Sequence, residues 1–258
     1  MTARNDEPFT FDPAQLAELS ARYGDAYRSA SPFAHVVIDD FVPEDVVALA
    51  ASEFPPADAA DWSLHVHSNS NKRALADPTA MRQTCRQLVA EFNSGAVTTF
   101  MERLTGIDGL IPDPHLFGGG LHECDAGGFL QVHADFNRHP KLQLDRRVNA
   151  LLFLNPEWHD EWGGALELWN RDMSTRERVI APVGGRLVVF STTSVSYHGH
   201  PRPLRSPDDV SRRSLALYYY TAGRPESERE AVHSTLYQQP GVAPKSVGMQ
   251  AKDSWVHR

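Results

Sequence analysis

A histidine and an aspartate lie two residues apart in the segment GGFLQVHADFN, at His133 and Asp135. The segment has the alternation of a β-strand, in which residues two apart project from the same face. Leu130, Val132 and Ala134 form the apolar face, so His133 and Asp135 share the other face. An imidazole and a carboxylate that project together can bind one metal ion. A pair at this spacing also arises by chance, so a third ligand is needed to define a site.

His198 is the candidate third ligand, because it follows an apolar strand predicted over residues 187–190. Two histidines and one carboxylate form the facial triad of non-haem Fe(II) oxygenases, which leaves coordination positions open. His200 competes with His198 for this place, and we favour His198. His65 and His67 also share a predicted strand face, but nothing downstream completes a metal site. We interpret that pair as structural or surface residues, and the lining of a pocket stays open as the alternative.

A basic residue opens the later predicted strand SRRSLALYYYT. In that strand Arg212 and Ser214 share one face, and Leu215 and Leu217 share the other. A buried guanidinium needs an anionic partner, and it can hold a carboxylate through two hydrogen bonds. We therefore predict that Arg212 and Ser214 bind a ligand carboxylate. Arg213 takes this role if the register slips by one residue, since a slip exchanges the two faces.

Helical patterns dominate the first hundred residues. The first begins with Asp12 as N-cap and Pro13 at the first helical position, and Gly24 is predicted to end it. Segments 42–55 and 77–93 repeat the pattern with apolar residues on one face, and segment 33–41 is a predicted strand. These patterns predict a helical layer over about residues 1–108.

From about residue 109 the pattern changes to short β-like runs separated by Gly, Pro, Asn and Asp. Many short strands with turn signals between them predict an antiparallel sandwich or barrel, here over about residues 109–222. The polar tail, residues 223–258, is predicted as loop or short helix. We therefore expect one domain over residues 1–258 that is mainly β with a helical N-terminal layer.

The 258-residue chain has an ordinary globular composition, with 41% hydrophobic and 22% charged residues. Its net charge of −8 argues against a nucleic-acid partner. No apolar run approaches the ~20 residues of a membrane span, and the N-terminus lacks the apolar stretch of a secretory signal. Cys85 and Cys124 indicate no disulfide framework. We therefore expect a cytoplasmic protein with neither nucleic-acid nor membrane partners.

Four segments together resemble a known family: HADF, VNALLFLNPEWHDEWGGALELW, GRLVVFSTTSVSYHGHP and RRSLALYYYT. They follow one another in the order, and at about the spacing, of the prolyl 4-hydroxylase-like branch of the Fe(II)/2-oxoglutarate-dependent dioxygenases. The opening PFAHVVIDDFVPEDVVALAASEFP is similar to the N-terminal segment of this branch, so the resemblance covers roughly residues 30–222. It implies a double-stranded β-helix core, the jelly roll that cupins also have.

The resemblance also assigns roles to single residues. It implies that His133, Asp135 and His198 are the catalytic metal ligands, which hold Fe(II). It implies that Arg212 holds the distal carboxylate of 2-oxoglutarate, with Ser214 as the small polar residue two positions later.

Two tyrosines that relatives place against the cosubstrate are missing from this chain. Phe153 stands where one of them has a hydroxyl group, and the other is replaced around Cys124 and Asp125. Cosubstrate binding is therefore expected to depend more on Arg212, and on Asn149, which shares the strand face of Phe153 by alternation. A strand-end cap is the alternative role for Asn149.

The resemblance implies hydroxylation of an unactivated C–H bond of a small molecule, an amino acid or a prolyl residue. The reaction would use Fe(II) as cofactor and would consume 2-oxoglutarate and O2, with succinate and CO2 as co-products. The cofactor supplies the difficult chemistry, and the protein supplies position and exclusion of water. Substrate identity and homodimer formation stay open.

Two other classes stay open as alternatives. One is a non-catalytic jelly-roll module that binds metal or 2-oxoglutarate, and the complete triad with Arg212 argues against it. The other is a cupin-like metal hydrolase or isomerase that uses Zn or Mn, which would not need Arg212.

Overall fold

The computed structural model describes residues 9–238 of the chain. The helices are α1 (Pro13–Ser29), α2 (Glu44–Ser52), α3 (Gln83–Phe92) and α4 (Gly95–Thr105). The first strands are β1 (His35–Ile38), β2 (Ser63–His67), β3 (Ser70–Leu75), β4 (Ile111–Pro112), β5 (Gly120–Cys124) and β6 (Phe129–Ala134). The later strands are β7 (Asp145–Phe153), β8 (Leu166–Trp169), β9 (Arg176–Ile180), β10 (Leu187–Ser191), β11 (His198–His200), β12 (Arg212–Thr221) and β13 (Leu236–Tyr237).

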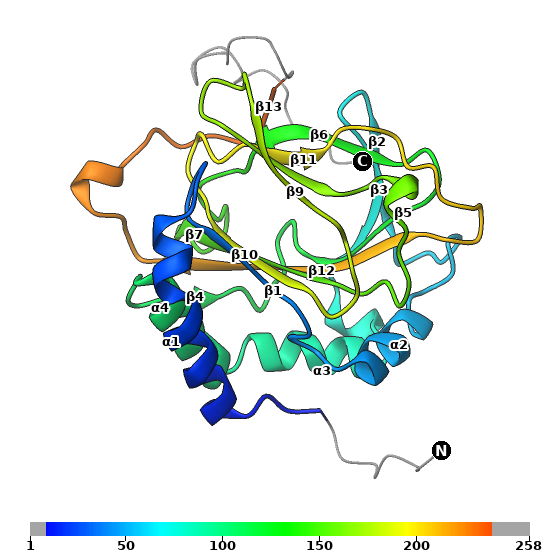
Figure 1. Ribbon diagram of the computed structural model, residues 1–258, viewed down its shortest axis with the longest axis horizontal. Coiled ribbons are helices and arrows are strands. Elements are labelled where there is room, and N and C mark those ends of the chain that lie inside the picture. The colour runs from blue at the N-terminus through cyan, green and yellow to red at the C-terminus, as the bar shows by residue number, and fades with distance from the viewer. Residues whose placement is uncertain (1–8, 239–258) are drawn as a thin grey trace.

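The strands pair into one antiparallel sheet that curls on itself. Its order is β1-β10-β7-β12-β5-β3-β6-β11-β8-β9, with β2, β4 and β13 attached at the side. Figure 1 shows all four helices on one side of the curled sheet, with β6, β11 and β13 at the opposite end. This is the double-stranded β-helix, and it confirms the predicted fold class, mainly β with a helical N-terminal layer.

The two faces of β7 show how alternation builds the core. Ala150 and Leu152 are fully buried in the large apolar cluster that β7, β10 and β12 share with the helices. Leu151 and Phe153 belong instead to apolar clusters on the inner face of the curled sheet. Asn149 shares that inner face, so a polar side chain is placed inside the jelly roll by strand period alone.

Helix α1 starts as predicted and ends later than predicted. Asp12 Oδ1 accepts a hydrogen bond from the Ala14 N–H at 2.9 Å, which caps the helix. The helix then continues through Gly24 to Ser29, so the prediction that Gly24 ends it was wrong. A Cβ at Gly24 would lie 3.6 Å from the Arg103 carbonyl oxygen of α4. That separation is an ordinary contact, so the packing of α1 on α4 does not require a glycine here, and the glycine does not end the helix.

Other predicted boundaries also needed correction. The segment predicted as one helix over 77–93 is a 3-10 turn (Pro78–Ala80) followed by α3 from residue 83. The N-terminal part also contains the β2–β3 hairpin, which becomes part of the sheet. In the tail, a short 3-10 turn (Glu226–Glu228) is followed by β13, which pairs with β6. Residues 239–258 lie outside the described part of the chain.

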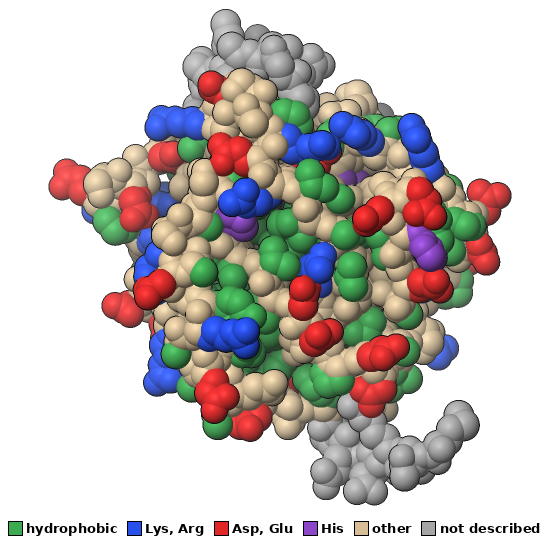
Figure 2. Space-filling view, viewed as in Figure 1, with side chains coloured by type: hydrophobic (Ala, Val, Ile, Leu, Met, Phe, Trp, Pro, Cys, Tyr) green, Lys and Arg blue, Asp and Glu red, His purple; other side chains and the backbone are tan. Residues whose placement is uncertain are grey.

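No helix within residues 9–238 is long and apolar enough to cross a bilayer. On the face that Figure 2 shows, acidic and basic side chains are interspersed, without a continuous basic field.

Candidate active site

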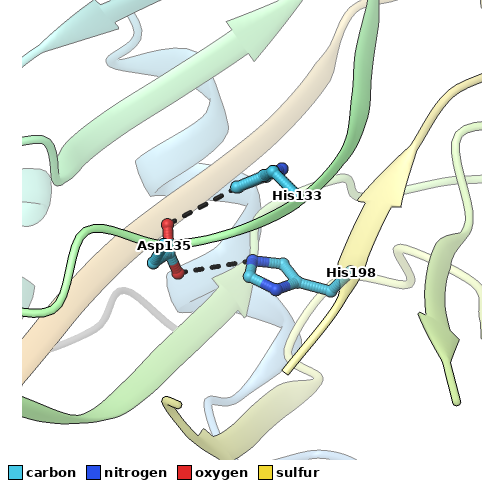
Figure 3. Close-up of side chains that lie close together, drawn as sticks. All are labelled: His133, Asp135 and His198. Atoms are coloured by element: carbon cyan, nitrogen blue, oxygen red, sulfur yellow. Dashed lines mark ion pairs between the residues drawn. The ribbon is translucent and has the colours of Figure 1, made fainter. Parts of the chain in front are cut away.

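Strands β6 and β11 bring the three predicted metal ligands to one point (Figure 3). His133 on β6 pairs directly with His198 on β11, and Asp135 follows the end of β6. The candidate ligand atoms of the three side chains all lie within 4.8 Å of one another. His133 Nε2 lies 3.5 Å from Asp135 Oδ1, and His198 Nε2 lies 3.4 Å from Asp135 Oδ2. The cross-strand pairing thus joins ligands that are far apart in sequence.

Backbone carbonyls orient both imidazoles. His133 Nδ1 lies 2.8 Å from the Gln131 carbonyl oxygen, and His198 Nδ1 lies 2.9 Å from the Ser196 carbonyl oxygen. Each Nδ1–H donates to its carbonyl, so Nε2 of each ring, which faces Asp135, is the atom left to bind a metal. This is the usual outer-shell arrangement of a metal-binding histidine.

The charge states of the triad suit metal binding at neutral pH. Burial lowers the pKa of His198 to about 4, so its ring is neutral and able to donate a lone pair. Burial alone would raise the pKa of Asp135, but Arg146 and the two histidines outweigh it and hold that pKa well below its ordinary value. Asp135 is therefore an ionised carboxylate.

Asn149 and Arg146 hold Asp135 in place. Asn149 Nδ2 donates to Asp135 Oδ2 at 2.7 Å, and Arg146 Nε donates to Asn149 Oδ1 at 2.9 Å. Arg146 Nη2 lies 3.1 Å from the same Asp135 oxygen. Because Asn149 lies in the middle of β7 (Asp145–Phe153), the alternative of a strand-end cap was wrong.

Arg146 is a site residue that the sequence analysis missed. It is fully buried, and its guanidinium carbon lies 3.4 Å from the Tyr218 ring centroid and 4.4 Å from that of Phe136. Stacking on aromatic rings satisfies part of a buried guanidinium. The only signal in the sequence was a charged residue on the same predicted strand as Asn149.

The register of β12 places Arg212 on the inner face. Arg212 is 6% exposed, its Nε donates to the Gly164 carbonyl oxygen at 2.7 Å, and its guanidinium carbon lies 5.0 Å from the Phe153 ring centroid. Arg213 projects from the opposite face, where its Nε donates to Glu123 Oε1 at 2.7 Å. The slipped register, with Arg213 inside, is therefore not the one adopted. Buried Ser214 pairs with Phe153 on β7.

The competing histidines lie elsewhere. His200 points to Cys124, with Nε2 3.9 Å from Sγ, so it stands apart from the triad that His198 completes. His67 is exposed on β2. His65 lies opposite Lys72 in the β2–β3 hairpin, and burial lowers its pKa to about 4. His65 thus lies beside the inner face, in keeping with the alternative that this pair lines a pocket.

Tyr237 is a second residue that the sequence analysis missed. It lies on β13, pairs with His133, and its ring centroid is 5.6 Å from that of His133. Burial raises its pKa to about 12, so the ring is a neutral phenol beside the triad. The tail was too weakly patterned to predict this strand.

The donor set fits Fe(II). Two imidazole nitrogens and one carboxylate are the donor set of a facial triad, and they would hold Fe(II) while leaving coordination positions open for ligands. Both rings already have the tautomer that coordination requires, and their Nε2 atoms are turned toward the carboxylate.

Residues 119–220 match the 2OG-Fe(II) oxygenase superfamily. Among solved structures, the fold is similar to a prolyl 4-hydroxylase of Pseudomonas putida, with 23% identity over 79% of this chain and 99% of that one and a TM-score of 0.54. It is also similar to a Trichoplax adhaerens prolyl hydroxylase in complex with a peptide fragment of hypoxia inducible factor. That likeness has 16% identity over 80% of this chain and 91% of that one, with a TM-score of 0.60.

HygX of Streptomyces hygroscopicus, whose structure contains nickel and 2-oxoglutarate, is also similar. It has 13% identity over 90% of this chain and 96% of that one, with a TM-score of 0.50. A comparison with curated proteins found no match.

The family match over residues 119–220 and the facial triad identify a 2OG-Fe(II) oxygenase domain in this chain. It is an Fe(II)- and 2-oxoglutarate-dependent dioxygenase whose fold is like that of the prolyl 4-hydroxylases.

Proposed function

We propose that this dioxygenase hydroxylates an unactivated C–H bond of a small molecule, an amino acid or a prolyl residue, and releases succinate and CO2. His133, Asp135 and His198 hold the iron in this proposal. The observation that carries it is the convergence of their ligand atoms within 4.8 Å. Iron, with 2-oxoglutarate and O2, supplies the oxidising chemistry when it is bound.

Arg212 binds the distal carboxylate of 2-oxoglutarate in this proposal. Its guanidinium lies on the inner face, and Nε donates to the Gly164 carbonyl oxygen. The two Nη atoms are then the donors for a planar anion such as a carboxylate. Phe153 supports the guanidinium from its face, and Ser214 lies beside Phe153 with a hydroxyl group for the same carboxylate. Because Phe153 has no hydroxyl, Arg212 supplies the main polar contact.

Asn149 contributes by holding Asp135 and not by touching the cosubstrate. Its amide donates to Asp135 Oδ2, which is then fixed relative to both imidazoles. Arg146 adds a positive charge to the same oxygen, which keeps the carboxylate ionised. Tyr237 covers the His133 ring and helps to exclude water from that side of the triad.

The known enzymes of similar fold suggest where to look for the substrate. One is named a prolyl 4-hydroxylase and another was solved with a peptide fragment, so proline-containing peptides and free proline are the first compounds to test. The remaining amino acids and small molecules follow.

The test is anaerobic addition of Fe(II) and then 2-oxoglutarate, with detection of the visible charge-transfer band of the iron–oxo-acid chelate. We expect the band in the wild-type protein and its loss in His133→Ala and Asp135→Ala. Succinate formation in air should fall at least 100-fold in both variants. Circular dichroism should show that both remain folded.

His159→Ala is the matched control, because His159 is exposed and its ring contacts Glu157 and Trp162 on the surface, away from the triad. It should keep both the band and the turnover. Turnover that survives in Asp135→Ala, or metal binding without any band, would overturn the proposed function. Hydrolysis or isomerisation that persists in Arg212→Met would favour a cupin-like metal enzyme instead.

A further inference from the structure

A second basic side chain lies beside Arg212 on the inner face of the sheet. Arg212 pairs with Cys124 across β12 and β5, and Arg73 pairs with Glu123 across β3 and β5. If the β3–β5 register is extended by one residue, Lys72 on β3 lies opposite Cys124 on β5. Arg212 on β12 lies on the other side of Cys124. Lys72 and Arg212 therefore flank one small side chain in a single cross-strand row.

Lys72 lies where β3 changes partners. Asn71 still pairs with Phe129 on β6, whereas Arg73 already pairs with Glu123 on β5. At this corner the Lys72 ammonium is directed inward, with Nζ 3.4 Å from His122 Nδ1. Burial lowers its pKa, and Asp135 attracts it at longer range. The corner thus aims a cation toward the triad.

No described carboxylate lies within 4.0 Å of Lys72 or of Arg212. Cys124, between them, does not supply a negative charge, because burial raises the pKa of its thiol. Arg212 is buried and Lys72 is half-buried, and a cation that is removed from water without a partner is costly. Here no carboxylate of residues 9–238 is such a partner.

Two further polar atoms in the same place, one on His122 and one on His200, are buried without a geometric hydrogen bond to the described residues. Lys72 donates to His122 Nδ1, which leaves the ring proton on Nε2, and that atom is buried without a hydrogen bond. His200 Nδ1 is also buried without a hydrogen bond, while its Nε2 lies against Cys124. Buried polar atoms of this kind are rare and indicate a ligand or an ordered water molecule.

A count of formal charges indicates that metal and cosubstrate do not complete the site. Arg146 offsets Asp135, and a divalent iron offsets the 2-oxoglutarate dianion. The positive charges of Arg212 and Lys72 are then both left over. One more anionic group near Lys72 would reduce this excess.

We propose that Lys72, together with His122 and His200, binds a carboxylate of the substrate. The proposal rests on the proposed function for the assignment of Arg212 to 2-oxoglutarate. It narrows the substrate to an acid, such as a free amino acid, whose carboxylate is held on the inner face while the reacting carbon lies at the triad. Lys72 and His122 are half-buried as whole residues, so a ligand can reach them, although the His122 Nε2 atom itself is buried.

Acetate is the probe for this site. We would add it to protein loaded with Zn(II) and 2-oxoglutarate, so that Arg212 is already occupied, and follow binding by saturation-transfer NMR. Wild type should give a saturable signal that falls at least tenfold in Lys72→Met and is kept in Lys72→Arg. Acetamide, which has the same shape without the charge, should give none.

Lys141→Met is the matched control, since Lys141 is the other lysine within residues 9–238 and it is exposed. It should bind acetate like the wild type. Lys72→Met should also unfold at a temperature no lower than wild type, because it removes a half-buried charge that no described carboxylate neutralises.

Equal acetate binding in Lys72→Met and wild type would overturn the proposal. A loss of 2-oxoglutarate affinity in Lys72→Met as large as that in Arg212→Met would also overturn it, by assigning Lys72 to the cosubstrate. If the wild type binds no 2-oxoglutarate, the proposed function fails. Acetate binding is then compared between metal-free Arg212→Met and the metal-free double variant Arg212→Met/Lys72→Met. Weaker binding in the double variant would still support the site.

Discussion

The inner and outer faces of β3, β5 and β12 treat basic residues in opposite ways. On the outer face, Arg73 and Arg213 both contact Glu123, at 2.8 Å and 2.7 Å. On the inner face, their sequence neighbours Lys72 and Arg212 have no described carboxylate within 4.0 Å. In each pair of neighbouring basic residues, Lys72–Arg73 and Arg212–Arg213, the second forms an ion pair with Glu123. The first has no described carboxylate as a partner.

This difference separates stability from binding. The Glu123 side chain is 2% exposed and has two arginine partners, so its charge is satisfied by the protein itself. The inner cations reduce stability unless something anionic joins them. We infer that the outer network holds the three strands together and that the inner face is built for ligands. Variants on the two faces should therefore affect different measurements.

The largest expected contrast is between Arg212→Met and Arg213→Met. Arg212→Met should weaken 2-oxoglutarate binding at least 30-fold, because it removes the proposed bidentate partner of the distal carboxylate. Arg213→Met should leave that affinity within about twofold. Calorimetric titration of 2-oxoglutarate into Zn(II)-loaded protein measures both. An equal loss of 2-oxoglutarate affinity in the two variants would contradict the idea that only the inner face binds the cosubstrate.

Glu123→Gln should act on stability alone. It leaves the Arg213 and Arg73 guanidinium groups without their shared buried carboxylate, and we expect a loss of about 3 kcal/mol in the free energy of unfolding. Urea denaturation provides the measurement. Glu157→Gln, at an exposed carboxylate, is the control and should stay within about 0.5 kcal/mol of wild type. A large change in 2-oxoglutarate affinity in Glu123→Gln would contradict the division of the faces.

Asp125→Asn should have the smallest effect, and that effect should depend on pH. Burial alone would raise the pKa of Asp125, but hydrogen bonds from Arg73 and Ser211 outweigh it and lower that pKa. The ionised carboxylate therefore stabilises the folded state above about pH 4, and this contribution is lost as the pH falls below that value.

Because the Asp125 side chain is 44% exposed, we expect less than about 1 kcal/mol at neutral pH. Urea denaturation of wild type and Asp125→Asn at pH 7 and near pH 3 should show the difference shrink. A difference that grows toward acid would show that burial dominates at this carboxylate.

Much of the site was predictable because it depends on strand period and on residue type. Alternation put His133 with Asp135, and Arg212 with Ser214, before any pairing was known. His198 followed from the ligand set that iron requires. The prediction for Asn149 was half complete, since its inward direction was expected and its contact with Asp135 was not.

The missed residues share one property, which is that only their partners reveal them. Arg146 is one charged residue among several until its contacts with Asp135 and Tyr218 are seen. Tyr237 lies on a two-residue strand, too short to show a period. Gly24 has the residue type of a helix end, yet it lies inside α1, where a Cβ would come 3.0 Å from Arg28 Nη1.

By itself the sequence determined the mainly β class, the composition of the iron site and the residues that share a face within one strand. These follow from local periods and from the chemistry of side chains, which need no knowledge of distant residues. The tertiary structure alone decided that Arg212 and not Arg213 lies inside, and that Lys72 joins it. Those facts depend on the pairing of β3 with β5 and of β5 with β12, strands far apart in the chain. Periodicity within a strand does not encode which strand becomes its neighbour.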